Sequence, residues 1–140
     1  MKILLAVDGS DYTKKMLAYL STHDELFSAN NSYTLLTVQP QLPPRARAAV
    51  GKDVVESFHR EESEKVLGPV TKFLLRHGID AKTVSKVGHA GEIISKTADS
   101  GKFDLVVMGS HGHGTLGNLV MGSVATQVLA HCKVPVLLVR

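Results

Sequence analysis

Runs of consecutive apolar residues alternate along this chain with segments whose apolar residues recur every three or four positions. A short continuous apolar run is typical of a strand that is buried on both faces of a parallel sheet. The runs predict strands at residues 3–7, 33–38, 81–87, 103–108 and 134–139, of which the third is the least apolar. Each strand is separated from the next by a segment with helical spacing.

The longest helical segment begins near Asp53, which can cap it, and its apolar residues, Phe58 among them, share one side. Pro69 interrupts the segment, so we expect the helix to kink or divide there. Shorter helices are predicted from about Asp11, over residues 91–98 and over residues 123–131. By contrast, residues 39–52 contain several prolines and are predicted to form a loop.

The alternation of strands and helices predicts the α/β class: a single doubly wound domain over residues 1–140, with a five-stranded parallel sheet and helices on both faces. A chain of 140 residues buries enough surface to fold without disulfides or a metal. Such sheets bind ligands outside the carboxyl ends of their strands, where the winding reverses. The loops that follow the strands are therefore the candidate binding segments.

The loop after the fourth strand contains His111 and His113, which together look like a metal clip. Two imidazoles do not complete a zinc site, and the other histidines do not stand at ligand spacing. Gly112, Gly114 and Gly117 spell the dinucleotide fingerprint G-x-G-x-x-G, but no helix starts there and no acid follows about 20 residues later. Both interpretations are therefore disfavoured, and the last two glycines are expected to give the loop flexibility over phosphates.

A longer spacing in the same region offers a third interpretation. Gly109-x-x-Gly112 follows a predicted strand, and after nine more residues Gly122-Ser123 opens a predicted helix. Glycines let the backbone approach a ligand closely, and a helix start offers unpaired N–H groups that suit phosphate. The same residues could equally be turn glycines and an ordinary helix cap. The residues alone leave both possibilities open.

This glycine spacing resembles the ATP-binding signature of the universal stress protein family. The resemblance extends along the chain, through ILLAVDGS at residues 3–10, VGHAGEII at 87–94 and CKVPVLLV at 132–139. It implies the strand order 3-2-1-4-5, with ATP at the switch point between strands 1 and 4. The implied contacts, from the base to the phosphates, are Ala6, Val7, Asp8, Val38, Met108, Gly109, His111, Gly112, His113, Gly122, Ser123, Val124 and Ala125.

Two of these positions have more than one interpretation. The carboxylate of Asp8 could accept hydrogen bonds from ribose hydroxyls or hold Mg²⁺ or Mn²⁺ beside the phosphates, or it could help to cap the first helix. Ala125 is a departure from the family pattern, because members that bind ATP often have threonine or serine there. The departure removes one hydroxyl that could contact phosphate.

The sequence lacks the parts of an efficient hydrolase. It has no G-x-x-x-x-G-K-[ST] motif, and no lysine or arginine lies between Gly109 and His131. We therefore expect a regulatory protein that holds ATP in a stress response and hydrolyses it slowly at most, rather than an enzyme. The alternative is a partner-binding module of the same fold that acts through dimerisation without nucleotide.

Composition narrows the expected partners and location. The net charge is only +3 and aromatic residues are 5%, which does not favour nucleic acid as a partner. The chain has no apolar stretch near the ~20 residues that span a membrane, and its one cysteine, Cys132, suits the reducing cytoplasm. The strand from Val134 to Val139 is expected at a sheet edge, where the family typically forms homodimers.

Overall fold

The computed structural model describes residues 1–113 and 120–140. Its strands are β1 (Lys2–Ala6), β2 (Ser32–Gln39), β3 (Lys82–Val87), β4 (Leu105–Gly109) and β5 (Val136–Val139). Its helices are α1 (Asp11–Ser21), α2 (Pro44–Val50), α3 (Lys52–Arg76), α4 (Ala90–Ser100) and α5 (Ser123–His131). All neighbouring strands are parallel and their order is β3-β2-β1-β4-β5, which confirms the predicted fold class and strand order.

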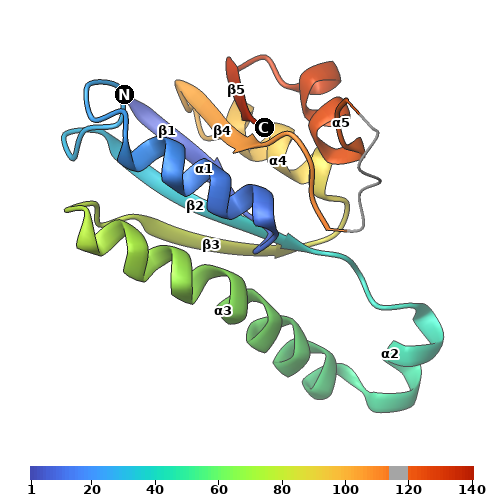
Figure 1. The fold of residues 1–140 in the computed structure, drawn as a ribbon. Coiled ribbons are helices and arrows are strands. Elements are labelled where there is room, and N and C mark those ends of the chain that lie inside the picture. The colour runs from blue at the N-terminus through green and yellow to red at the C-terminus, as the bar shows by residue number, and fades with distance from the viewer. Residues whose placement is uncertain (114–119) are drawn as a thin grey trace.

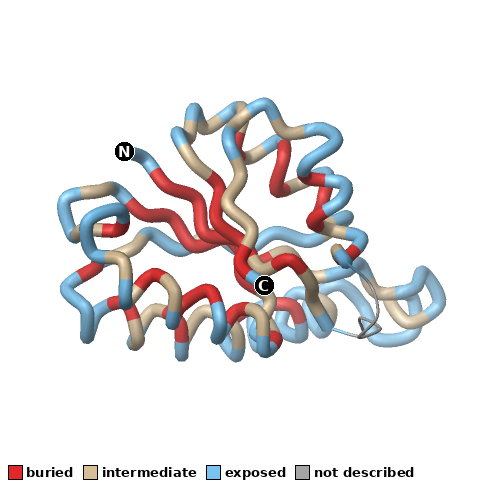
Figure 2. Tube along the Cα trace, turned by 45° about the horizontal axis from the view of Figure 1, so that its top comes forward, coloured by how far each residue is buried: buried red, intermediate tan, exposed pale blue. Residues whose placement is uncertain are grey.

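Both faces of the sheet are covered by helices, α1 and α3 on one face and α4 and α5 on the other (Figure 1). The central strand β1 shows why its sequence is apolar throughout. Ile3 and Leu5 pack under α1 and α3, whereas Leu4 and Ala6 point to the opposite face and pack under α4 and α5. Figure 2 shows the buried residues concentrated in the central strands and on the inner sides of the helices.

The edge strands are less buried than the centre. β3 forms one edge and is almost entirely exposed, in keeping with its low apolar content. β5 forms the other edge and is half-buried apart from Val139. The chain passes outward from β1 to β2 and β3, then returns to the other side of β1 with β4. The winding therefore reverses between β1 and β4.

The prediction of a loop over residues 39–52 is wrong, because Pro44–Val50 form α2. Pro44 stands at the first helical position, where its missing N–H has no cost, and the following alanines and arginines favour a helix. Every residue of α2 is at least partly exposed, and α2 lies beyond the carboxyl end of β2 (Figure 1). Its apolar pattern was therefore too weak to reveal it.

The long helix α3 also departs from expectation in three ways. It begins at Lys52, with Gly51 rather than Asp53 at the cap position. It runs without division through Pro69, because Gly68 before the proline has no Cβ to clash with the ring. Phe58 is 40% exposed instead of facing the core, since the buried side of this helix carries His59 and Ser63.

Within the described residues, no helix is both long enough and apolar enough to cross a bilayer.

Candidate functional site

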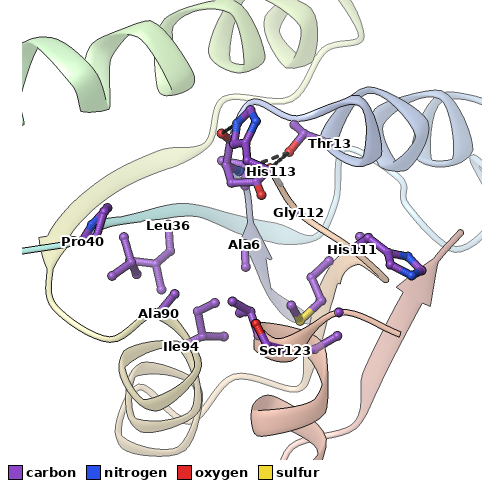
Figure 3. Close-up of a pocket in the computed structure, with 18 residues that line it drawn as sticks. Ala6, Thr13, Leu36, Pro40, Ala90, Ile94, His111, Gly112, His113 and Ser123 are labelled. Carbon is purple, nitrogen blue, oxygen red and sulfur yellow. Dashed lines mark hydrogen bonds between the residues drawn. The ribbon is translucent and has the colours of Figure 1, made fainter. Parts of the chain in front are cut away.

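A pocket of about 340 Å³ lies at the carboxyl ends of β1 and β4, where the winding reverses (Figure 3). Its volume falls in the range of roughly 300–1,000 Å³ that is usual for small-molecule sites. After β1 the chain enters α1 on one face of the sheet, and after β4 it leads to α5 on the other face. The two segments diverge, and the pocket opens between them.

Every residue that the sequence assigned to the nucleotide lines this pocket. The pocket also contains residues that the sequence analysis missed: Thr13, Leu36, Pro40, Ala90 and Ile94. Leu36 stands two positions before Val38 on the same strand, so strand periodicity could have found it. The pocket brings the assigned residues together, and their contact with a nucleotide stays a prediction.

One end of the pocket is apolar. The side chains of Leu36 and Val38 come from β2, and those of Ala90 and Ile94 come from the first turns of α4. Leu36 and Ile94 are also part of the core beneath α4 and α5, so this wall is held by packing. A wall of this kind can receive a flat, weakly polar group such as a nucleobase.

The other end of the pocket is formed by the start of α5. The first backbone hydrogen bond of this helix runs from the Thr126 N–H to the Gly122 carbonyl at 3.0 Å, and among the described side chains none caps it. The N–H groups of Ser123, Val124 and Ala125 therefore lack acceptors within the helix, and all three residues line the pocket. Together with the helix dipole, these groups favour an anion.

Three glycines allow the backbone to close around this end. A Cβ on Gly109 would lie 2.6 Å from the Cβ of Tyr12, and one on Gly112 would lie 2.6 Å from Oδ2 of Asp8. A Cβ on Gly122 would lie 3.1 Å from the Cα of His111. Side chains at these positions would push α1, the β1–α1 turn and α5 away from the loop after β4. The spacing of the glycines therefore reflects close packing of three segments.

Asp8 organises the start of α1. Its Oδ1 accepts hydrogen bonds from the Ser10 N–H at 2.9 Å and from the Thr13 hydroxyl at 3.0 Å, and its own N–H donates to the Thr13 hydroxyl at 3.1 Å. Gly9 makes the turn possible with a φ of 77°. Ser10 occupies the cap position, but its side chain makes no capping bond. The Asp8 carboxylate therefore holds the turn that leads into α1, through the N–H of the cap residue Ser10 and the hydroxyl of Thr13 in the first helical turn, and this does not exclude a role toward a ligand.

The two histidines of the loop make different contacts. The His111 ring lies against the Tyr12 ring, tilted by 35° with 4.8 Å between the ring centroids, and its Nδ1 lies 2.8 Å from the Ser110 hydroxyl. His113 places Nε2 2.7 Å from the backbone carbonyl oxygen of Asp8. Across residues 1–113 and 120–140, no three His, Cys, Asp or Glu side chains gather closely enough to hold a metal ion. Gly114 and Gly117 of the disfavoured dinucleotide fingerprint lie outside the described residues.

Ala125 is 2% exposed, and its methyl group packs in the core beneath α4 and α5. The next hydroxyl along the helix belongs to Thr126, and it donates to the Gly122 carbonyl at 2.8 Å. Ser123 is consequently the residue of this helix start that offers a hydroxyl to the pocket. The described lining contains no lysine or arginine, so the donors that the start of α5 offers at this end are backbone N–H groups and the Ser123 hydroxyl.

Cys132 lies partly buried at the end of α5. Burial raises the pKa of its thiol above the usual value, and the nearby Asp99 carboxylate acts in the same direction. We therefore assign it a packing role in the core beneath α4 and α5.

Fold and pocket together define an open parallel α/β protein with a ligand-sized cavity at its topological switch point. A model described as the universal stress protein family matches residues 1–140. A universal stress protein of Thermus aquaticus is 31% identical over 139 residues, which cover 99% of this chain and 97% of that protein. The chain therefore belongs to the universal stress protein family, as the glycine spacing indicated.

The relatives differ in length. Universal stress protein Slr1230 of Synechocystis sp. is 32% identical over 140 residues, 99% of this chain, which spans only 42% of that protein. The structure of MJ0577 of Methanocaldococcus jannaschii superposes with a TM-score of 0.83 at 26% identity, covering 99% of this chain and 94% of that one.

Two more distant structures share the fold and contain nucleotides. One is a universal stress protein in complex with cAMP, with a TM-score of 0.62, 22% identity and coverage of 100% and 96% of the two chains. The other is a family protein of Arabidopsis thaliana with AMP bound, with a TM-score of 0.69, 18% identity and coverage of 99% and 90%.

Proposed function

We propose that this protein binds ATP at the switch point between β1 and β4 as a stress-response or regulatory protein. The observation that carries the proposal is a single pocket that combines an apolar end with the first turn of α5. An apolar wall suits a base, and N–H groups at a helix start suit phosphate. The AMP and cAMP held by two proteins of this fold support an adenine nucleotide as the ligand.

Each end of the pocket suits one part of such a ligand. The base would lie against Val38 and Ile94, and the phosphates would face the N–H groups of Ser123, Val124 and Ala125. No lysine or arginine lies between positions 109 and 131 to stabilise charge that develops during phosphoryl transfer. We therefore assign a binding role to the site, with hydrolysis slow at most.

The alternative is a partner-binding module of the same fold that uses no nucleotide. Mass spectrometry of small molecules released by heating the purified protein separates the two functions. We expect an adenine nucleotide in the released fraction, and a rise in the unfolding temperature when ATP is added. A protein that releases none, and whose unfolding temperature does not change in millimolar ATP, would favour the alternative.

Asp8 is our candidate for holding Mg²⁺ or Mn²⁺ beside the phosphates, because it is the carboxylate that lines the pocket. A bare phosphate chain near this carboxylate is repelled by about 1 kcal/mol at 4 Å in water, and by more in a protein. We expect EDTA to weaken ATP binding about tenfold in the wild type, a factor that corresponds to about 1.4 kcal/mol. Titration calorimetry with and without MgCl₂ measures the change.

The matched variant is Asp8→Asn, whose remaining oxygen can still accept from the Ser10 N–H and the Thr13 hydroxyl. Its stability should change little, and its ATP affinity should no longer respond to EDTA. An equal response in both proteins would show that the metal binds without this carboxylate.

We further propose that the protein is a cytoplasmic homodimer that pairs through the edge formed by Val134 to Val139. β5 lies at one end of the sheet, and its half-buried apolar side chains leave an edge that another strand can extend. Light scattering of the wild type should give the mass of two chains. A monomer would contradict this part of the proposal.

Leu138→Pro should convert the dimer to monomers without disrupting the sheet. The carbonyls of Pro135 and Val139 accept hydrogen bonds from the N–H groups of Val106, in β4, and Ser110, directly after it. Backbone groups of successive residues in a strand point to opposite sides, so Leu138, next to Val139, directs its N–H away from β4. Proline is tolerated at such an outward position and removes the donor that a partner strand would need. Light scattering and far-UV circular dichroism measure the two effects, and a dimer that persists would exclude pairing through this donor.

A further inference from the structure

A hydrogen bond between described residues joins the two segments that diverge around the pocket. The ring of His113, in the loop after β4, approaches the backbone of Asp8, in the turn after β1, with 2.7 Å between Nε2 and the carbonyl oxygen. Figure 3 shows the ring of His113 on the same side of the pocket as Thr13, which binds the carboxylate of Asp8. The bond spans 105 positions of the sequence.

The Asp8 carbonyl determines which ring nitrogen of His113 carries a hydrogen. A carbonyl oxygen can only accept, so Nε2 of His113 must carry the hydrogen. That donor is then engaged with the protein and does not point to a phosphate. A neutral ring protonated at Nε2 and a charged ring both satisfy the bond, so the contact does not depend on the charge of the histidine.

The other bonds of Asp8 are local. Its N–H and its Oδ1 are engaged with Ser10 and Thr13, within five residues of the chain. Across the pocket, Asp8 is held by His113 at its carbonyl and by the close approach of Gly112 to Oδ2. Among the bonds of the described residues, the ring bond is therefore a directional contact that ties the loop after β4 to the turn after β1.

We infer that His113 is a positioning residue: it fixes the backbone of Asp8 against the loop after β4, and so presets the part of the pocket that receives the nucleoside. This inference rests on the proposed nucleotide function and adds a role for a residue that acts through Asp8 without touching the ligand. Because the His113 ring does not act on phosphate, its removal must lower the affinities for adenosine and for ATP by the same factor.

Two variants test the inference by titration calorimetry with adenosine and with ATP. His113→Leu removes the donor and should lower the affinity for both ligands about fivefold, which is the effect expected of one intramolecular hydrogen bond. His113→Gln keeps an N–H at the position of Nε2 and should restore both affinities to within about twofold of the wild type. His77→Leu is the matched control, because its ring also binds a backbone carbonyl, at 2.9 Å, but lies outside the pocket.

Each other outcome overturns the inference. A loss confined to ATP would mean that the ring contacts phosphate, and no loss for either ligand would mean that the bond does not preset the pocket. Failure of glutamine to restore binding would mean that the ring itself is required. If the wild type binds neither ligand, the proposed function is wrong, and so is the predicted effect of His113 on affinity.

The hydrogen bond itself is tested independently of any ligand. Nitrogen NMR of the ligand-free protein near pH 8, where histidine is generally neutral, reports which ring nitrogen of His113 is protonated. We expect the proton on Nε2, and a proton on Nδ1 would exclude the bond to Asp8.

Discussion

Replacing Gly122 with valine is expected to weaken ATP binding about a hundredfold or more. A Cβ at this position would lie 3.1 Å from the Cα of His111 and 3.3 Å from the carbonyl oxygen of Ser110. Both are backbone atoms of the loop after β4, so the valine must move the start of α5 away from that loop. At least two N–H bonds to phosphate would be lost, and hydrogen bonds to charged groups contribute about 1.5–3 kcal/mol each.

The matched control for this variant is Ala49→Val, because Ala49 is an exposed helical position outside the pocket. Calorimetry should show wild-type affinity for the control and no measurable binding for Gly122→Val. Circular dichroism should show that both variants are folded. If Gly122→Val binds ATP within tenfold of the wild type, the start of α5 does not hold the phosphates.

Replacing Gly109 with valine should destabilise the fold by about 3 kcal/mol, at the upper end of the usual cost of overpacking. A Cβ there would lie 2.6 Å from the Cβ of Tyr12 and 3.2 Å from the carbonyl oxygen of His111. Neither neighbour is the end of a flexible side chain, so α1 must shift relative to β4. Urea unfolding of wild type and variant measures the difference in the free energy of unfolding.

Ala49→Val again serves as the control, since it places valine at an exposed helical position. Its free energy of unfolding should fall by about 0.7 kcal/mol or less, because alanine and valine differ by no more than that in helix propensity. A Gly109→Val protein as stable as this control would show that α1 does not depend on a glycine at the end of β4.

The sheet could be predicted because the residues of its central strand must be apolar on both faces. Ile3, Leu4 and Leu5 are consecutive and apolar because β1 is covered on both faces, and this pattern appears in the sequence without any knowledge of contacts. The place of the pocket followed from the alternation of elements, since the winding must reverse somewhere. Gly109, Gly112 and Gly122 then identified the segment, and the fold shows three close approaches at these positions.

The parts that could not be predicted depend on contacts between distant segments. Ile94 reaches the pocket because α4 packs beside β2, a placement that its own helical pattern does not contain. The bond from His113 to Asp8 joins two loops, and sequence spacing carries no information about it. α2 was missed for a different reason: its residues are all at least partly exposed, so burial left no periodic pattern in its sequence.

Isothermal titration of the wild-type protein with ATP in the presence of MgCl₂ tests the central claim most directly. We expect saturable binding of one nucleotide per chain with a Kd below about 1 mM, which corresponds to more than about 4 kcal/mol of binding free energy. Binding that is absent at millimolar ATP would contradict the proposed function.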